Sequence, residues 1–184
     1  MYYHMNIAGL ERDLKLFPVN DKIQIAAFIL FGDVEMTEVA ARELIKRAPE
    51  FDIILTAEAK SIALAHEMAR AAGRNDYIIA RKHKKVYMED PISSIVDSIT
   101  TPGLQELFLG KDDVELMRGH RVLIVDDVVS TGGSLKSLEA LVEAAGGIIA
   151  GKMFVLAEGD AADRDDVIFL EKLPLFDAEG NPID

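Results

Sequence analysis

Short runs of mostly apolar residues alternate, along the middle of the chain, with segments in which apolar residues recur at helical spacing. The short runs predict buried strands; they occupy 51–56, 77–80, 122–125, 148–156 and 167–170. The helical segments occupy 33–47, 61–72 and 134–145. This alternation predicts an α/β fold with an open, mostly parallel β-sheet flanked by helices.

Residues at the ends of the helical segments support these boundaries. Asp33 is a suitable N-cap for the first helix, and Ser61 opens the second. Gly73 and Gly146 follow the second and third helices, where glycine commonly ends a helix. The helices therefore have recognisable ends in the sequence.

Two regions show no clear period. Residues 1–32 are apolar but irregular, and within them only 22–28 alternates enough to predict an edge strand. Residues 86–118 are mixed in character and are interrupted by proline and glycine. Because a long loop in a compact domain is usually functional or disordered, the second region is a candidate for a functional loop.

Composition narrows the class of protein. With 184 residues, 49% hydrophobic and 28% charged, the chain is expected to be a single globular domain spanning 1–184. It has no cysteine, which fits a reducing cytoplasm, and no apolar stretch or signal pattern that would predict a membrane or export. The net charge of −12 argues against a nucleic-acid partner, which normally requires a basic surface.

The most specific chemical pattern lies at 122–134. A buried strand leads into Asp126 and Asp127, then into a loop rich in hydroxyl groups and glycine, and then into a helix. Glycines let a backbone approach an anion closely, and successive N–H groups at a helix N-terminus attract it. The pattern predicts a phosphate-binding loop. Two carboxylates would repel the phosphate itself, so they are expected to bind sugar hydroxyls or a hydrated Mg²⁺.

Competing motifs fit the residues of this segment less well. A P-loop needs a lysine after its second glycine, but Gly133 is followed by Ser134. A receiver domain needs a longer chain after its aspartates than residues 128–184 provide. An ordinary strand, turn and capped helix would account for neither the paired aspartates nor the paired glycines.

The segment 122–134 closely resembles the phosphoribosyl-pyrophosphate (PRPP) motif of type I phosphoribosyltransferases. In that family the two acids hold the ribose hydroxyls and the following loop holds the 5′-phosphate. The resemblance therefore implies catalytic roles for Asp126 and Asp127. It implies 5′-phosphate binding by Val129, Ser130, Thr131, Gly132, Gly133 and Ser134.

Two further segments gain meaning beside this motif. The turn at 56–61 resembles the pyrophosphate loop of purine phosphoribosyltransferases, although Lys60 stands where arginine or serine is more familiar. The run at 81–85 resembles a segment of bacterial xanthine enzymes and places four basic residues together in an acidic chain; His83 within it is expected to be a loop residue. The implied pyrophosphate-binding residues are Ala57, Glu58, Ala59, Lys60, Arg81, Lys82, Lys84 and Lys85.

The resemblance also assigns roles to the remaining regions. Residues 86–110 would form a flexible lid over PRPP, in which Glu106 is the nearest counterpart of a lid glutamate. Residues 1–32 and 157–184 would form a small hood subdomain that holds the base. Base contacts are expected from Phe28, Val128 and Glu158. Some family members place a proton acceptor three residues after the second aspartate; here that residue is Ser130, so Glu106 or the hood would have to take this role.

The implied activity is purine phosphoribosyl transfer from PRPP, in which a cytoplasmic homodimer releases pyrophosphate. Mg²⁺ would arrive with PRPP, with Asp126 and Asp127 as candidate ligands, and neither nucleic acid nor membrane is expected as a partner. The alternative is a PRPP-sensing regulator that has lost turnover. Such regulators usually carry an added DNA-binding domain or a basic face, and the sequence shows neither.

The choice of base follows from one stretch. The 20–36 region looks most like the xanthine branch, where an asparagine meets the oxo-purine, but here Leu30 or Phe31 replaces it. An oxygen left unpaired in a dry pocket costs roughly 1–3 kcal/mol. We therefore expect adenine to be the preferred base and hypoxanthine the second, with a xanthine or hypoxanthine enzyme as the alternative.

Overall fold

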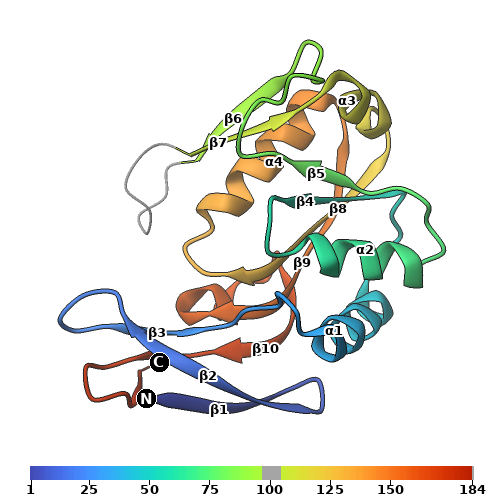
Figure 1. Cartoon of the computed structure of the whole chain (residues 1–184). Coiled ribbons are helices and arrows are strands. Elements are labelled where there is room, and N and C mark those ends of the chain that lie inside the picture. Colours follow the sequence, from blue (N-terminus) through green and yellow to red (C-terminus); the bar gives the residue numbers. More distant parts are fainter. Residues whose placement is uncertain (97–104, 184) are drawn as a thin grey trace.

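The central element of the fold is a five-stranded parallel sheet. The structure, a computed structural model, describes residues 1–96 and 105–183. The sheet has the order β10-β9-β8-β4-β5, and every neighbouring pair is parallel (Figure 1). Its strands are β4 (Ile53–Ala57), β5 (Ile78–Ala80), β8 (Arg121–Val129), β9 (Ile148–Glu158) and β10 (Ile168–Leu173). The predicted open, parallel α/β sheet is confirmed.

Helices cover both faces of this sheet because successive strand residues point to opposite sides. Ile54 packs in one apolar cluster with residues of α1 and α2, whereas its neighbour Leu55 packs in another with residues of α4. The helices are α1 (Val34–Arg47), α2 (Ile62–Ala71), α3 (Lys111–Met117) and α4 (Gly133–Ala145), with a 3-10 turn, η1 (Gly159–Asp163), after β9. Within the described ranges, no helix combines the length and apolar character needed to cross a membrane.

The helix ends agree with the sequence signals. Asp33 caps α1, since its side chain accepts a hydrogen bond of 3.0 Å from the Met36 N–H. Gly146 has φ of 75° and ends α4 in the left-handed conformation that glycine tolerates best. These boundaries follow from local chemistry, which is why the sequence predicts them.

The N-terminal region was wrongly predicted to be irregular. It forms three antiparallel strands, β1 (Tyr2–Ile7), β2 (Leu10–Pro18) and β3 (Gln24–Ala27). A tight turn through Ala8 and Gly9, both with positive φ, joins the first two strands. The strand predicted within 22–28 is confirmed as β3, but it is not an edge strand, since β3 lies between β2 and β11 (Leu175–Phe176). With β12 (Pro182–Ile183), the two ends of the chain share one sheet, and its role as a hood remains a prediction.

The segment without a clear period forms an antiparallel hairpin. Its strands are β6 (Ile92–Val96) and β7 (Gln105–Leu109), followed by α3. The hairpin packs on α4, where the Ser137 hydroxyl donates to the Ile95 carbonyl at 3.3 Å and the Leu107 side chain is buried. Both strands lie within the predicted lid at 86–110, whose residues 97–104 lie outside the described residues.

Candidate active site

Most of the predicted site segments lie at the carboxyl ends of strands in the parallel sheet. The turn after β4, the basic run after β5, the end of β8 and the end of β9 all lie at the carboxyl ends of adjacent strands. Open α/β sheets bind ligands at this edge. Strand order thus places segments 57–61, 81–85 and 126–134 near one another although they are far apart in sequence.

The paired aspartates lie within β8 and not after it. The pairing of β8 with β4 ends at Ile124, whereas its pairing with β9 continues to Val129. The sequence prediction ended the strand at Val125, where the apolar run ends. The strand continues through the acids because its pairing with β9 does not stop there. Asp126 and Asp127 therefore lie beyond the last residue that pairs with β4.

The environment of the two carboxylates is unusual. Asp127 is 4% exposed, and its Oδ2 is buried without a hydrogen-bond partner in the described part of the chain. Lys60 Nζ lies 3.8 Å from that oxygen. Burial and the neighbouring charge of Asp127 raise the pKa of Asp126 to about 7. An unpaired, buried carboxylate oxygen of this kind fits a hydroxyl group or a cation of a ligand.

Ser61 is a site residue that sequence reasoning missed. The sequence placed it at the end of the 56–61 turn and the start of α2 without indicating a binding role, but its hydroxyl makes no cap and donates instead to Oδ1 of Asp126. The residue is fully buried. A signal for this role was its place as the last residue of the pyrophosphate-like turn at 56–61.

The loop between β8 and α4 has the geometry of an anion site. Ser130, Thr131 and Ser134 are exposed, whereas Gly132 is buried and has φ of +81°. This left-handed glycine turns the chain into α4, whose first N–H groups have no partner within the helix. These donors and the helix dipole favour an anion at the start of α4.

Glu58 connects the turn after β4 to the basic run after β5. Its carboxylate accepts from the Lys82 N–H at 2.9 Å and lies 3.7 Å from Arg81 Nε. The Lys82 N–H, and then the charge of Arg81, lower the pKa of Glu58. The Glu58–Ala59 peptide is cis. Because the charge of Glu58 is compensated in this way, it does not oppose an anion beside Lys60.

The basic run is also joined to the hairpin. Arg81 exchanges two backbone hydrogen bonds with Phe108, of 2.9 and 2.8 Å. Lys82, His83 and Lys84 are exposed, and Lys85 is half-buried. Glu106 is exposed on the same hairpin, where it accepts a hydrogen bond of 2.5 Å from Ser93. In the described residues no contact links Glu106 to the paired aspartates.

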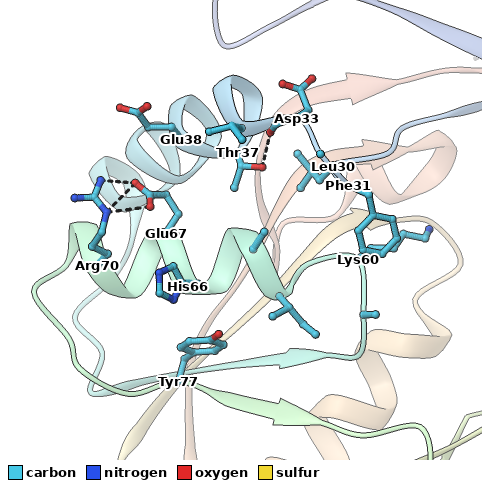
Figure 2. Close-up of a pocket in the computed structure, with 15 residues that line it drawn as sticks. Leu30, Phe31, Asp33, Thr37, Glu38, Lys60, His66, Glu67, Arg70 and Tyr77 are labelled. Carbon is cyan, nitrogen blue, oxygen red and sulfur yellow. Dashed lines mark hydrogen bonds and ion pairs between the residues drawn. The ribbon is translucent and has the colours of Figure 1, made fainter.

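The candidate base-binding residues differ in exposure. Phe28 and Leu30 are 6% and 1% exposed and pack in the core, whereas Phe31 is 60% exposed. Phe31 and Lys60 line one end of a cavity of about 750 Å³ between α1 and α2, with the Glu67–Arg70 ion pair at the other end (Figure 2). Phe31 is thus the aromatic ring of this stretch that is available to a ligand.

Glu158 lies at the end of β9, beside the phosphate loop. Burial raises the pKa of its carboxyl group, and a hydrogen bond from Ser130 and the charge of Lys60 oppose that shift. Val128, half-buried, donates its backbone N–H to Asp127 Oδ1 at 3.0 Å. A half-buried carboxyl group with few partners is suited to a polar ligand atom.

Comparisons with known proteins agree with this geometry. The family model for the phosphoribosyl transferase domain matches residues 36–179. The adenine phosphoribosyltransferase of Thermotoga petrophila is 30% identical over 162 residues, covering 83% of this chain and 87% of that protein. The hypoxanthine/guanine phosphoribosyltransferase of Methanocella paludicola is 30% identical over 145 residues, covering 79% of this chain and 69% of that protein. The solved structure of the adenine phosphoribosyltransferase of Thermoanaerobacter pseudethanolicus superposes with a TM-score of 0.69 at 26% identity. The match covers 86% of this chain and 95% of that one.

Proposed function

Since the chain belongs to the phosphoribosyl transferase family, we propose that it joins the 5-phosphoribosyl group of PRPP to a purine base, with adenine preferred. Pyrophosphate is the second product. The observation that carries the proposal is the buried Oδ2 of Asp127, which has no hydrogen-bond partner among the described residues, a few residues before the left-handed Gly132 and within 4 Å of Lys60. One strand end thus offers an acceptor for sugar hydroxyls beside a site for the phosphate.

The proposed reaction uses charge at both ends of the ribose. PRPP would place its 5′-phosphate at the start of α4, its ribose hydroxyls on Asp126 and Asp127, and its pyrophosphate beside Lys60. As the C1–O bond breaks, the ribose gains positive charge and the pyrophosphate gains negative charge. The aspartates stabilise the first and Lys60, with the basic run after β5, stabilises the second.

Mg²⁺ is part of the proposal because PRPP carries several negative charges. The unpaired Oδ2 of Asp127 fits a cation, but among the described residues no group of three or more His, Cys, Asp or Glu side chains could hold a metal ion. Asp126 and Asp127 would therefore hold the ion together with oxygens of PRPP and water. When bound, Mg²⁺ would neutralise charge on the leaving pyrophosphate.

The preference for adenine rests on Glu158 and Phe31. Adenine presents an exocyclic amine, which needs an acceptor, and the half-buried carboxylate of Glu158 beside Ser130 is an acceptor at the end of β9. A 6-oxopurine presents an oxygen there, which an ionised carboxylate repels. Phe31 is the exposed ring that would stack on the purine. The relatives named adenine phosphoribosyltransferase support the same choice.

A competition experiment tests this function. Adenine, hypoxanthine, guanine and xanthine at equal concentrations compete for limiting PRPP in the presence of Mg²⁺, and the nucleotide products are separated. We expect adenosine monophosphate to dominate. A pool dominated by xanthosine monophosphate would overturn the choice of base, and the absence of pyrophosphate release with every base would favour a PRPP-sensing regulator.

We also propose that the protein is a homodimer. Several large apolar side chains are exposed after β3, at the start of α1 and after β5, and a second copy would cover them. They are Ile29, Val34, Val86 and Tyr87. Light scattering at several protein concentrations would test this, and a monomer at all of them would contradict it.

A further inference from the structure

Arg164 lies against the phosphate loop although it is far from that loop in sequence. It follows η1, which leads the chain away from the end of β9. A Cβ atom added to Gly132 would lie 2.9 Å from Arg164 Nη1. The guanidinium group therefore flanks the glycine that turns the loop into α4.

The orientation of this guanidinium is fixed by Asp166. Arg164 Nε and Nη2 donate to the two carboxylate oxygens of Asp166, each at 2.8 Å. Such a two-point pair holds the plane of the guanidinium and leaves Nη1 as the remaining nitrogen. Nη1 is the atom that faces Gly132, and no hydrogen bond of Nη1 is found in the described part of the chain.

A second pair anchors Asp166 to the helix that begins at the phosphate loop. Lys152 of β9 donates to Asp166 and also to Glu139 of α4, the latter at 2.8 Å. Lys152 is only 14% exposed, and Arg164 is 29% exposed. The network of two cations and two carboxylates thus ties Arg164 to α4 and keeps it in place at the loop.

The position has an electrostatic consequence. The loop itself supplies hydroxyl groups and backbone N–H groups, but residues 129–134 contain no charged side chain. The cations Lys60 and Arg81 lie by the turn after β4, the proposed pyrophosphate end of the site. Arg164 places a cationic group beside the loop itself, and Nη1 is the nitrogen that its pairing with Asp166 leaves for an anion there.

We propose that Arg164 is a binding determinant for the 5′-phosphate. Its guanidinium supports the Gly132 turn and places a positive charge beside the phosphate, so that ligands with a 5′-phosphate gain affinity. This inference rests on the proposed function, because it requires that the loop binds that phosphate. Arg164 is a positioning residue and takes no part in bond breaking.

The test compares Arg164→Met, which keeps length without charge, with Arg164→Lys, which keeps charge without the two-point pair. Arg42→Met is the matched control, since Arg42 is 54% exposed on α1. Calorimetry measures the Kd of ribose 5-phosphate and of pyrophosphate for each protein. For Arg164→Met we expect about a tenfold weaker Kd for ribose 5-phosphate, as for loss of a charge-assisted contact, with pyrophosphate unchanged. Arg164→Lys should bind ribose 5-phosphate about threefold more weakly, and the Arg42→Met control should bind it as the wild-type protein does.

Kinetics gives a second readout, because Arg164→Met should raise the KM for PRPP about tenfold and leave kcat within about twofold. Unchanged affinity of Arg164→Met for ribose 5-phosphate would overturn the inference, as would an equal loss for pyrophosphate, which would indicate general damage. If Arg164→Met does not fold, the Kd values of Arg164→Lys for ribose 5-phosphate and for pyrophosphate decide between the same outcomes. Failure of the wild-type protein to bind ribose 5-phosphate would instead overturn the proposed 5′-phosphate site itself.

Discussion

Ser61 and Asp126 join the two halves of the candidate active site. The Ser61 hydroxyl, at the start of α2, donates a hydrogen bond to Oδ1 of Asp126 in β8. Ser61 is the last residue of the pyrophosphate-like turn at 56–61, and Asp126 is proposed to hold the ribose. A shift of either segment therefore displaces the other.

Replacing Ser61 with alanine should weaken both activity and stability. Loss of a hydrogen bond to a charged buried group costs roughly 1.5–3 kcal/mol, and each kcal/mol shifts the Tm of a domain of this size by about 2–4 °C. We expect a Tm lower by several degrees and a kcat/KM for PRPP about tenfold lower. Ser137→Ala is the control, because Ser137 is likewise a buried serine, but among the described residues it donates only to backbone carbonyls. Equal losses of activity in both variants would contradict a specific role.

Replacing Asp126 with asparagine should stabilise the ligand-free fold at high pH. The folded pKa of about 7 lies above the ordinary carboxyl value, so the folded protein binds this proton more tightly than the unfolded chain. Stability is lost as pH rises from the ordinary value through 7, and asparagine avoids that loss. We expect a Tm gain of a few degrees at pH 8 and little gain at pH 4, measured without Mg²⁺ or PRPP. A Tm gain that did not grow with pH would show that ionisation of Asp126 does not destabilise the folded protein.

The double variant Asp126→Asn, Asp127→Asn tests the proposed ribose contacts. It keeps the shape of both side chains and removes both charges. We expect kcat/KM to fall by at least about 100-fold, which corresponds to roughly 2.7 kcal/mol of transition-state stabilisation. Far-ultraviolet circular dichroism would check that the fold is retained. Normal turnover by this variant would show that the charges of Asp126 and Asp127 are not needed for catalysis.

Gly132→Ala should disrupt the phosphate loop for two reasons. A side chain at φ of +81° is strained, and its Cβ would lie 2.9 Å from the Arg164 guanidinium. Gly73→Ala is a matched control, since Gly73 also has positive φ, +66°, but nothing lies within 4 Å of an added Cβ. Both variants should lose about 1 kcal/mol of stability, but only Gly132→Ala should lose ribose 5-phosphate binding by calorimetry. Intact binding by Gly132→Ala would contradict the role of the loop.

Glu158→Gln should weaken the preference for adenine. The amide can offer either a donor or an acceptor, whereas the ionised carboxylate offers only an acceptor. We expect the ratio of kcat/KM for adenine to that for hypoxanthine to fall about tenfold, with Asp163→Asn, an exposed change on η1, as the control. Because the pKa of Glu158 is raised, acidification protonates it earlier than an ordinary glutamate, so the wild-type preference should also weaken as pH falls. An unchanged ratio in Glu158→Gln would place the base away from this carboxyl group.

The sequence by itself determined the parts of this protein that depend on near neighbours along the chain. The spacing of apolar residues predicts the parallel strands and the helices α1, α2 and α4, and Asp33 and Gly146 mark helix ends because capping is a local interaction. The residues of the motif at 122–134 are contiguous, so the sequence alone predicts their chemistry without knowledge of the fold. The strand order then brings the other predicted segments to the same sheet edge.

Only the tertiary structure decided the features that join distant residues. The N-terminal strands complete their sheet with β11 and β12 from the other end of the chain, and no local pattern in residues 1–32 announces that partner. Burial of Phe28 and exposure of Phe31 depend on what packs against them. The hydroxyl of Ser61 could have capped its own helix, and Arg164 could have been a surface charge. Their contacts with Asp126 and with the Gly132 turn exist because folding brings together residues that are 65 and 32 positions apart in the chain.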